Sequence, residues 1–180
     1  MAIAIFPVAS SAGKTMFRTT LTSGSNYTVP AGVTYLNVTL YGGGGGGGGV
    51  GISSAPGQPG AGGTTTFTGA TSATGGTAGH YSFANSSNTN IDAVSPGTAG
   101  TSNTGEPGLA GQTYTKSANQ GYIRGIDGRR GQVISSTLTT SPGASIAYSI
   151  GGGGAGGGAS NSCSEGGAGG SGFIVVEYWA

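Results

Sequence analysis

The chain has 180 residues, of which 42 are glycine and 7 are proline, and its formal net charge is +1. Glycine therefore makes up about 23% of the chain, against an ordinary share of ~7%. The small net charge argues against disorder driven by charge repulsion. Collagen is excluded because glycine does not recur at every third position and proline is scarce.

The length favours a single domain. Large side chains are few, with 5 Phe, 8 Tyr and 1 Trp, so hydrogen bonding between closely packed glycine segments is expected to add to apolar burial. The single cysteine excludes an intramolecular disulfide. Apolar stretches fall short of the ~20 residues of a membrane helix, so we expect no membrane insertion. The first residues lack the basic start of a signal peptide, which predicts a protein made in a host cytoplasm without cleaved export.

Residues 1–20 are predicted to be an N-terminal attachment segment, followed by one glycine-rich domain over residues 21–180. The attachment segment begins with apolar residues, and Ile3, Ile5 and Phe6 would be costly to leave in water. We expect these three residues to contact a sister chain or a fibre protein.

Strand signals are short and well separated, and no stretch shows the periodicity of a helix. In residues 34–41 the aliphatic residues alternate with polar and aromatic ones, which places the aliphatic side chains on one face. The run 173–179 is rich in β-branched and aromatic residues and predicts a strand covered on both faces. A further alternating strand is predicted at 146–150, with weaker ones at 27–29 and 64–68.

Two glycine runs follow predicted strands directly, one at Gly42–Gly49 and one at 151–158. The polyproline II conformation has three residues per turn and no internal hydrogen bonds. A buried glycine run in this conformation must therefore find its hydrogen-bond partners in other segments. We predict an all-β fold with packed polyglycine II helices, a small glycine-rich sandwich with essentially no α-helix. The alternative is that the runs are mobile loops on a small β-sandwich.

Three blocks of sequence, in this order, resemble the glycine-rich domain of bacteriophage tail-fibre and adhesin proteins. They are LTSGSNYTVPAGV at 21–33, leading into a strand and polyglycine, SPGASIAYSIGG at 141–152, and GSGFIVVEYW at 170–179. The resemblance implies a domain at or near the distal end of a tail fibre on the virion. In the related T-even-type adhesins, packed polyglycine II helices hold variable loops that contact the host surface. Tail fibres are commonly trimers, whereas the related T-even-type adhesins cap a trimer as single chains. Between these alternatives, the apolar start of the chain favours a homotrimer.

The chain differs from that family in having no long fibre shaft. Attachment to the virion is then expected to fall to the N-terminal segment or to a partner fibre protein.

Two more complex inserts, 80–96 and 112–130, interrupt the glycine-rich scaffold. Arginine forks match the phosphates and carboxylates of lipopolysaccharide and acidic capsules. Aromatic faces and amides suit sugar rings or a loop of an outer-membrane protein. We therefore predict that receptor-binding residues lie in these inserts. The candidates are His80, Tyr81, Phe83, Asn85, Tyr114, Lys116, Tyr122, Arg124, Arg129 and Arg130. Alternatively, the basic residues form only a solvated loop and the aromatic residues only close the edge of the glycine lattice.

Other chemistry is weakly supported. Residues 9–15 end like a nucleotide-binding loop, but Val8 stands where that motif requires glycine. His80 is the only histidine, no nucleophile elbow is present, and the carboxylates are scattered without a glycosidase motif. One cysteine and one histidine cannot form a structural zinc site. The net charge is too small for a surface that follows a nucleic-acid backbone. We expect no catalytic residues, no cofactor, no metal and no nucleic-acid partner.

The leading expectation is a phage tail-fibre tip protein that binds a host cell-surface receptor, either an outer-membrane protein or a surface polysaccharide. Its other partners would be tail-fibre or virion proteins. The alternative is a structural virion component, a fibre segment or a capsid decoration, whose glycine-rich body serves rigidity and assembly. A bacterial surface or matrix protein built for extensibility is a more distant third expectation.

Overall fold

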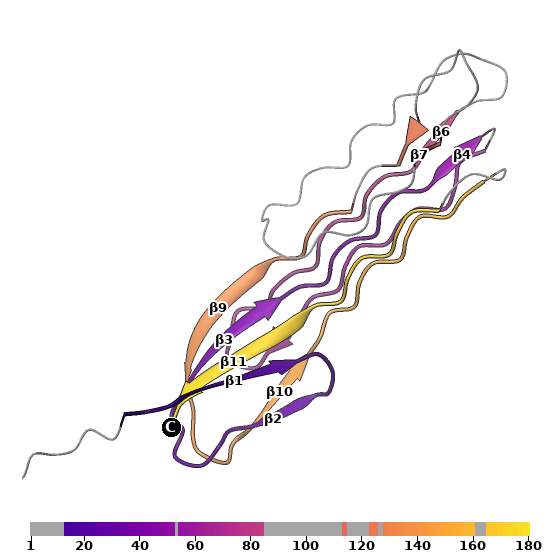
Figure 1. Cartoon of the computed structure of the whole chain (residues 1–180). Coiled ribbons are helices and arrows are strands. Elements are labelled where there is room, and N and C mark those ends of the chain that lie inside the picture. The colour runs from indigo at the N-terminus through magenta and orange to yellow at the C-terminus, as the bar shows by residue number, and fades with distance from the viewer. Residues whose placement is uncertain (1–12, 53, 85–112, 115–122, 126–127, 161–164) are drawn as a thin grey trace, which may run out of the picture.

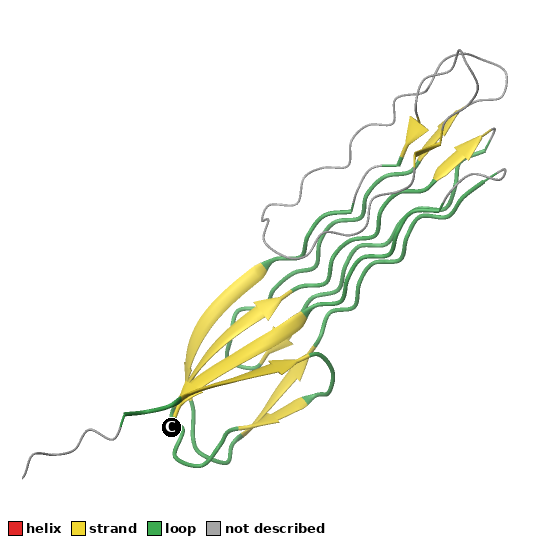
Figure 2. Cartoon of the chain, viewed as in Figure 1, coloured by secondary structure: helices red, strands yellow, loops and turns green. Residues whose placement is uncertain are grey.

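A computed structural model describes residues 13–52, 54–84, 113–114, 123–125, 128–160 and 165–180. At residues 52, 82–84, 113–114 and 123–124 it describes the backbone only. The described residues form strands and extended connections and contain no helix, which confirms the predicted all-β class (Figure 2). The strands are β1 (Met16–Leu21), β2 (Asn26–Thr28), β3 (Tyr35–Tyr41), β4 (Val50–Ile52), β5 (Thr66–Phe67), β6 (Ser82–Ala84), β7 (Thr113–Tyr114), β8 (Ile123–Arg124), β9 (Val133–Thr139), β10 (Ser145–Ser149) and β11 (Phe173–Trp179).

Two antiparallel sheets form one end of the molecule, called here the sheet end (Figure 1). The larger sheet has four strands in the order β1-β11-β3-β9, and the smaller has three in the order β2-β10-β5. At the opposite end, called the far end, β4 pairs in parallel with β6, and β7 pairs antiparallel with β8. Thr15 and Ala180 exchange both backbone hydrogen bonds, at 2.9 and 3.1 Å. Both termini of the described chain therefore lie at the sheet end.

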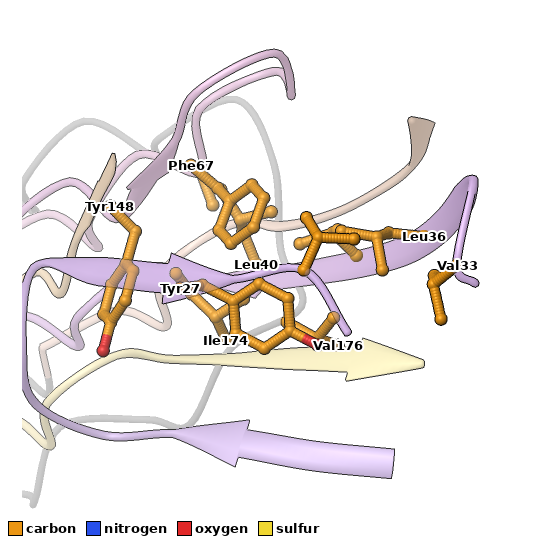
Figure 3. Packing of buried hydrophobic residues seen from close by; sticks show 11 residues of the cluster. Tyr27, Val33, Leu36, Leu40, Phe67, Tyr148, Ile174 and Val176 are labelled. Atoms are coloured by element: carbon orange, nitrogen blue, oxygen red, sulfur yellow. The ribbon is translucent and has the colours of Figure 1, made fainter. Parts of the chain in front are cut away.

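The hydrophobic core lies between the two sheets (Figure 3). The larger sheet contributes aliphatic side chains that are fully buried, and these are Leu36, Val38, Leu40, Ile174 and Val176. Each strand of the smaller sheet contributes one aromatic ring. The ring of Phe67 lies 6.2 Å from that of Tyr27 and 6.3 Å from that of Tyr148. Truncating one of the buried leucines to alanine would cost about 2–5 kcal/mol of stability, so this small core is a substantial stabilising element.

Tyr27 is expected to titrate late at alkaline pH. Burial, and secondarily the charge of Tyr178, raises its pKa above the ordinary value of 10.0. In the unfolded chain the pKa of Tyr27 is near the ordinary value. Protonated Tyr27 therefore makes its full contribution to the free energy of unfolding at pH values below that ordinary pKa. This contribution is lost as the pH rises through the raised folded pKa.

Phenolate absorbance, followed against pH for the parent and for Tyr27→Phe, measures this directly. The substitution should remove a tyrosine whose pKa lies above the ordinary value of 10.0, and it should reduce the loss of stability at alkaline pH. The prediction would be contradicted if the tyrosine lost in Tyr27→Phe were one that titrates near the ordinary value of 10.0.

The predicted strands at 34–41, 146–150 and 173–179 correspond to β3, β10 and β11, within one residue at each boundary. Strand β11 is buried on both faces at its middle, as predicted, because Val175 on the face away from the core is only 4% exposed. The weaker signals at 27–29 and 64–68 correspond to β2 and the short β5.

The sequence did not predict β1 and β9, the two edge strands of the larger sheet. Strand β9 contains four serine and threonine residues, and only Ile134 and Leu138 reach the core cluster. Strand β1 overlaps the end of the predicted attachment segment but pairs along its whole length with β11, and Phe17 stacks on Tyr178 at 5.3 Å. Attachment through the residues that precede β1 stays a prediction.

Six glycine-rich segments run side by side between the sheet end and the far end, and together they are called the glycine-rich body (Figures 1 and 2). They are 42–49, 57–63, 74–81, 125–132, 151–158 and 165–172, of which the structure describes all residues except 126–127. The first, called the central segment, continues β3 and forms backbone hydrogen bonds with each of the other five, as the donor to three and the acceptor from two.

Along the central segment, the neighbour that receives or donates the backbone hydrogen bond changes from residue to residue and repeats every third residue. The N–H groups of Gly42 and Gly45 donate to segment 125–132, those of Gly43 and Gly46 to segment 57–63, and those of Gly44 and Gly47 to segment 165–172, with N···O distances between 2.7 and 3.0 Å. The carbonyls follow the same period. Those of Gly43 and Gly46 accept from segment 74–81, and those of Gly44 and Gly47 accept from segment 151–158. The run is therefore a hydrogen-bonded element of the fold, unlike a loop lying on a sandwich.

Candidate functional site

The central segment fixes the backbone that leads to the first insert. Gly76 and Gly79 donate to the carbonyls of Gly43 and Gly46, each at 2.8 Å. A Cβ added at Gly48 would overlap the carbonyl of His80, so these two backbones are in direct contact. Beyond this point the chain enters β6, which pairs in parallel with β4. The start of the insert is therefore held at the far end.

His80 and Tyr81 form a half-buried aromatic pair at this position. Their ring centroids lie 5.0 Å apart, with the ring planes inclined at 38°. The Nδ1 atom of His80 lies 3.0 Å from the carbonyl oxygen of Tyr81, and since a carbonyl can only accept, Nδ1 donates. In the neutral imidazole Nε2 is then an acceptor, which leaves His80 able to receive a hydrogen bond from a ligand hydroxyl or amide.

The second insert reaches the same end of the molecule. Strands β7 and β8 pair with Tyr114 opposite Ile123 and Thr113 opposite Arg124, and β8 contacts β6. The backbones at Phe83, Tyr114 and Arg124 are thus brought together at the far end, although about thirty residues or more of sequence separate Phe83 from the other two. This gathering was not evident from the sequence.

Arg129 and Arg130 lie further from the far end, along the side of the glycine-rich body. The N–H of Arg129 donates to Thr77 at 2.9 Å and its carbonyl accepts from Gly45 at 2.8 Å, so its backbone is part of the packed body. Both arginine residues are exposed. The sequence was interpreted as exposed turns in this stretch, but its described residues run extended. A Cβ at Gly125 would overlap the carbonyl of Gly48, whereas a Cβ at Gly128 would overlap that of Gly45, so the backbones next to Arg124 and Arg129 lie beside different parts of the central segment.

Asn85, Lys116 and Tyr122, together with the attachment residues Ile3, Ile5 and Phe6, lie outside the described residues.

A second group of surface residues, not singled out from the sequence, lies on the face of the larger sheet away from the core. Near the termini, large side chains are exposed: Tyr35 at 62%, Met16 at 53% and Trp179 at 45%. Beside them a shallow polar hollow of about 330 Å³ is lined by Asn37, Thr39, Ser135, Thr137 and Glu177, with Val38 and Ser136. The signal in the sequence is weak, because some of these residues occupy the alternate positions of β3, which was recognised by its aliphatic face, and others lie in β1 and β9, which were not predicted.

Charged groups are sparse throughout the described chain. Arg18 and Glu177 form an ion pair there, with Nε and Oε1 at 3.6 Å, and no cluster of three potential metal ligands occurs in the same residues. Within the described ranges no helix is long and apolar enough to cross a membrane.

Comparison with protein-family models and with curated proteins gave no match for this chain.

Proposed function

We propose that this chain is the receptor-binding tip protein of a phage tail fibre, carried on the virion as a homotrimer with other tail-fibre or virion proteins as partners. It binds a host cell-surface receptor, an outer-membrane protein or a surface polysaccharide, through the inserts on its glycine-rich body. The observation that carries the proposal is the separation of the two ends. Both described termini lie at the sheet end, whereas His80, Tyr81 and strands β6 to β8 lie at the far end (Figure 1).

We further propose that the segments of the glycine-rich body are packed polyglycine II helices. Three observations support this: the hydrogen bonds of the central segment have a period of three, the segment has no internal backbone hydrogen bond, and its partners lie in five neighbouring segments. A period of three without internal bonds is the geometry of polyproline II chains. Such a body offers few side chains for contact with a receptor. Receptor specificity is therefore expected to come from the two inserts that the body carries.

Adsorption to host cells tests the basic part of the candidate surface. Arg124→Ser/Arg129→Ser/Arg130→Ser is expected to fold like the parent, because Arg129 and Arg130 are exposed and exposed charges contribute little stability. If the receptor is anionic, virions that carry the triple variant should adsorb roughly tenfold more slowly than the parent at low salt. The difference should be smaller at high salt, where charges are screened.

Two control variants sharpen this test. The triple arginine-to-lysine variant keeps the charge and removes the bidentate forks, so it separates general attraction from specific pairing. Lys14→Ser removes a positive charge at the sheet end and should leave adsorption unchanged. Unchanged adsorption of the triple serine variant at every ionic strength would move the assignment to His80, Tyr81 and Phe83.

Virions that lack the protein distinguish this proposal from a structural role. Intact particles that fail to adsorb support a receptor-binding tip. Loss of an appendage or of particle integrity supports the structural alternative, a fibre segment or capsid decoration.

A further inference from the structure

The larger sheet ends in two edge strands, β1 and β9, whose outward-facing backbone groups can be assigned from the hydrogen-bond pattern. Thr140 donates to Thr34 and Gly42 to Gln132, each at 2.9 Å, so the even-numbered residues of β9 bond to β3. In an antiparallel ladder the alternate residues point away from the partner. In β9 these outward residues include Ser135, Thr137 and Thr139, and none of the three bonds to a further strand among the described residues.

The same reasoning applies to the other edge. Thr15 and Ala180 form a doubly hydrogen-bonded pair, which assigns Phe17, Thr19 and Leu21 to bonds with β11. The outward residues of β1 are then Met16, Arg18 and Thr20, all of them exposed. Each edge strand therefore directs the backbone groups of at least three alternate residues outward, with the same spacing on both edges.

The outward residues of both edges have their side chains on the same face of the sheet. A single row of opposed residues crosses it from Arg18 through Glu177 and Asn37 to Thr137. The row is joined by the Arg18–Glu177 ion pair at 3.6 Å and by a 2.9 Å hydrogen bond from Thr137 Oγ1 to Asn37 Oδ1. A doubly hydrogen-bonded pair needs both side chains on one face. The β9 edge of one copy can therefore continue onto the β1 edge of another without interrupting the pleat.

Strand direction and composition also favour a second copy as the partner. Successive strands of the sheet are antiparallel, so β1 and β9 run in opposite directions. When two copies point the same way, β9 of one copy then meets β1 of the next in the antiparallel sense. Natural proteins protect exposed edges with charges, proline or bulges, but the seven residues of β9 include no charged residue, proline or glycine.

We propose that β9 of one copy pairs antiparallel with β1 of a second copy, with Thr137 opposite Arg18 of that copy. This contact is heterologous, so repeating it closes a ring if the rotation permits. The copies in the ring share one direction, with all sheet ends together and all far ends together. The inference supplies the contact for the homotrimer of the proposed function, but its test needs no host cell and fails independently of receptor binding.

Disulfide trapping tests the pairing in the full chain, with Cys163→Ser as the background. In the proposed register the Cα atoms of residue 18 and residue 137 of the neighbouring copy lie about 5.5 Å apart, within disulfide range. Within one copy the two positions are three strands apart, about 14 Å, which is too far to bridge. Arg18→Cys/Thr137→Cys should therefore give covalent oligomers on non-reducing gels, ending at three chains if the ring is a trimer.

Matched variants make the result specific. Arg18→Cys with Ser136→Cys, whose side chain faces the core side, should give at least tenfold less product. A mixture of the two single variants, Arg18→Cys and Thr137→Cys, should give dimers only. Efficient crosslinking of Thr137→Cys alone would show β9 paired with β9 and overturn the proposal, and so would the absence of any product from the double variant.

A proline substitution provides a second measurement that does not depend on cysteine chemistry. In Thr137→Pro the lost N–H faces outward, so the chain should fold and sediment as a monomer. Ser136→Pro removes a bond to β3 and should destabilise the fold itself. A Thr137→Pro protein that assembles like the parent in sedimentation would overturn the inference.

Discussion

Gly45→Ala is expected to lower the free energy of unfolding by about 3 kcal/mol, and Gly45→Leu by more, because the glycine-rich body has no room for a side chain there. A Cβ at Gly45 would overlap the carbonyl oxygen of Thr77. The obstacle is backbone that is itself hydrogen-bonded to Arg129 at 2.9 Å, so it cannot move aside like the end of a side chain. Thermal or urea unfolding of the parent and the variants measures the loss.

Gly170→Ala is the matched control. Gly170 also lies in the body and its carbonyl accepts from Gly44 at 2.7 Å, but a Cβ there meets nothing within 4 Å. The control should be neutral, or more stable by a few tenths of a kcal/mol because alanine restricts the unfolded chain. Equal stability of the Gly45→Ala and Gly170→Ala proteins would show that the central segment is a loose loop.

Thr65→Val is expected to cost about 1–3 kcal/mol, although the two side chains are nearly the same size. Thr65 is fully buried where the sheets meet the glycine-rich body. Its hydroxyl donates to the carbonyl of Tyr41 at 2.7 Å and accepts from the N–H of Gly151 at 3.0 Å. Valine leaves the N–H of Gly151 without this acceptor in a buried site, whereas the carbonyl of Tyr41 keeps its place opposite Phe173 in the sheet, and one buried unpaired group costs about 1–3 kcal/mol.

Its neighbour offers a control with the same chemical change. The Thr66 hydroxyl lies 2.8 Å from that of Ser149 in an exposed position, where water can replace the lost partner. Thr66→Val should change the unfolding free energy by less than about 0.5 kcal/mol. Equal losses from the two variants in urea unfolding would show that the Thr65 hydroxyl does not join the sheet to the body.

The strands with a strong one-faced or continuous apolar pattern could be predicted from the sequence, and the edge strands could not. In β3 the aliphatic positions Leu36, Val38 and Leu40 are all fully buried, so the pattern and the burial coincide. In β9 the core needs only Ile134 and Leu138, and serine and threonine occupy most of the remaining positions. An edge strand with one exposed face carries too few apolar residues to be distinguished from a loop by periodicity.

The candidate site was only partly predictable for a different reason. The glycines at 125, 128 and 131 recur every third residue, and a Cβ on any of them would overlap a carbonyl of the central segment. That spacing was available in the sequence and indicates a packed segment where turns were expected. The proximity of β6 and β8 at the far end depends on how far several glycine segments extend before the chain turns, and no local pattern encodes this.

The three-residue repeat of the central segment also limits how this architecture can change in length. Inserting one or two residues into a glycine segment would redirect every later N–H and C=O to the wrong neighbour, whereas inserting three would restore the match. Three residues add about 9 Å, and all six segments of the body would need the same addition to stay level. Gradual lengthening or shortening of the body is therefore blocked. Divergence between such proteins should concentrate in the connections at its two ends, where any number of residues fits.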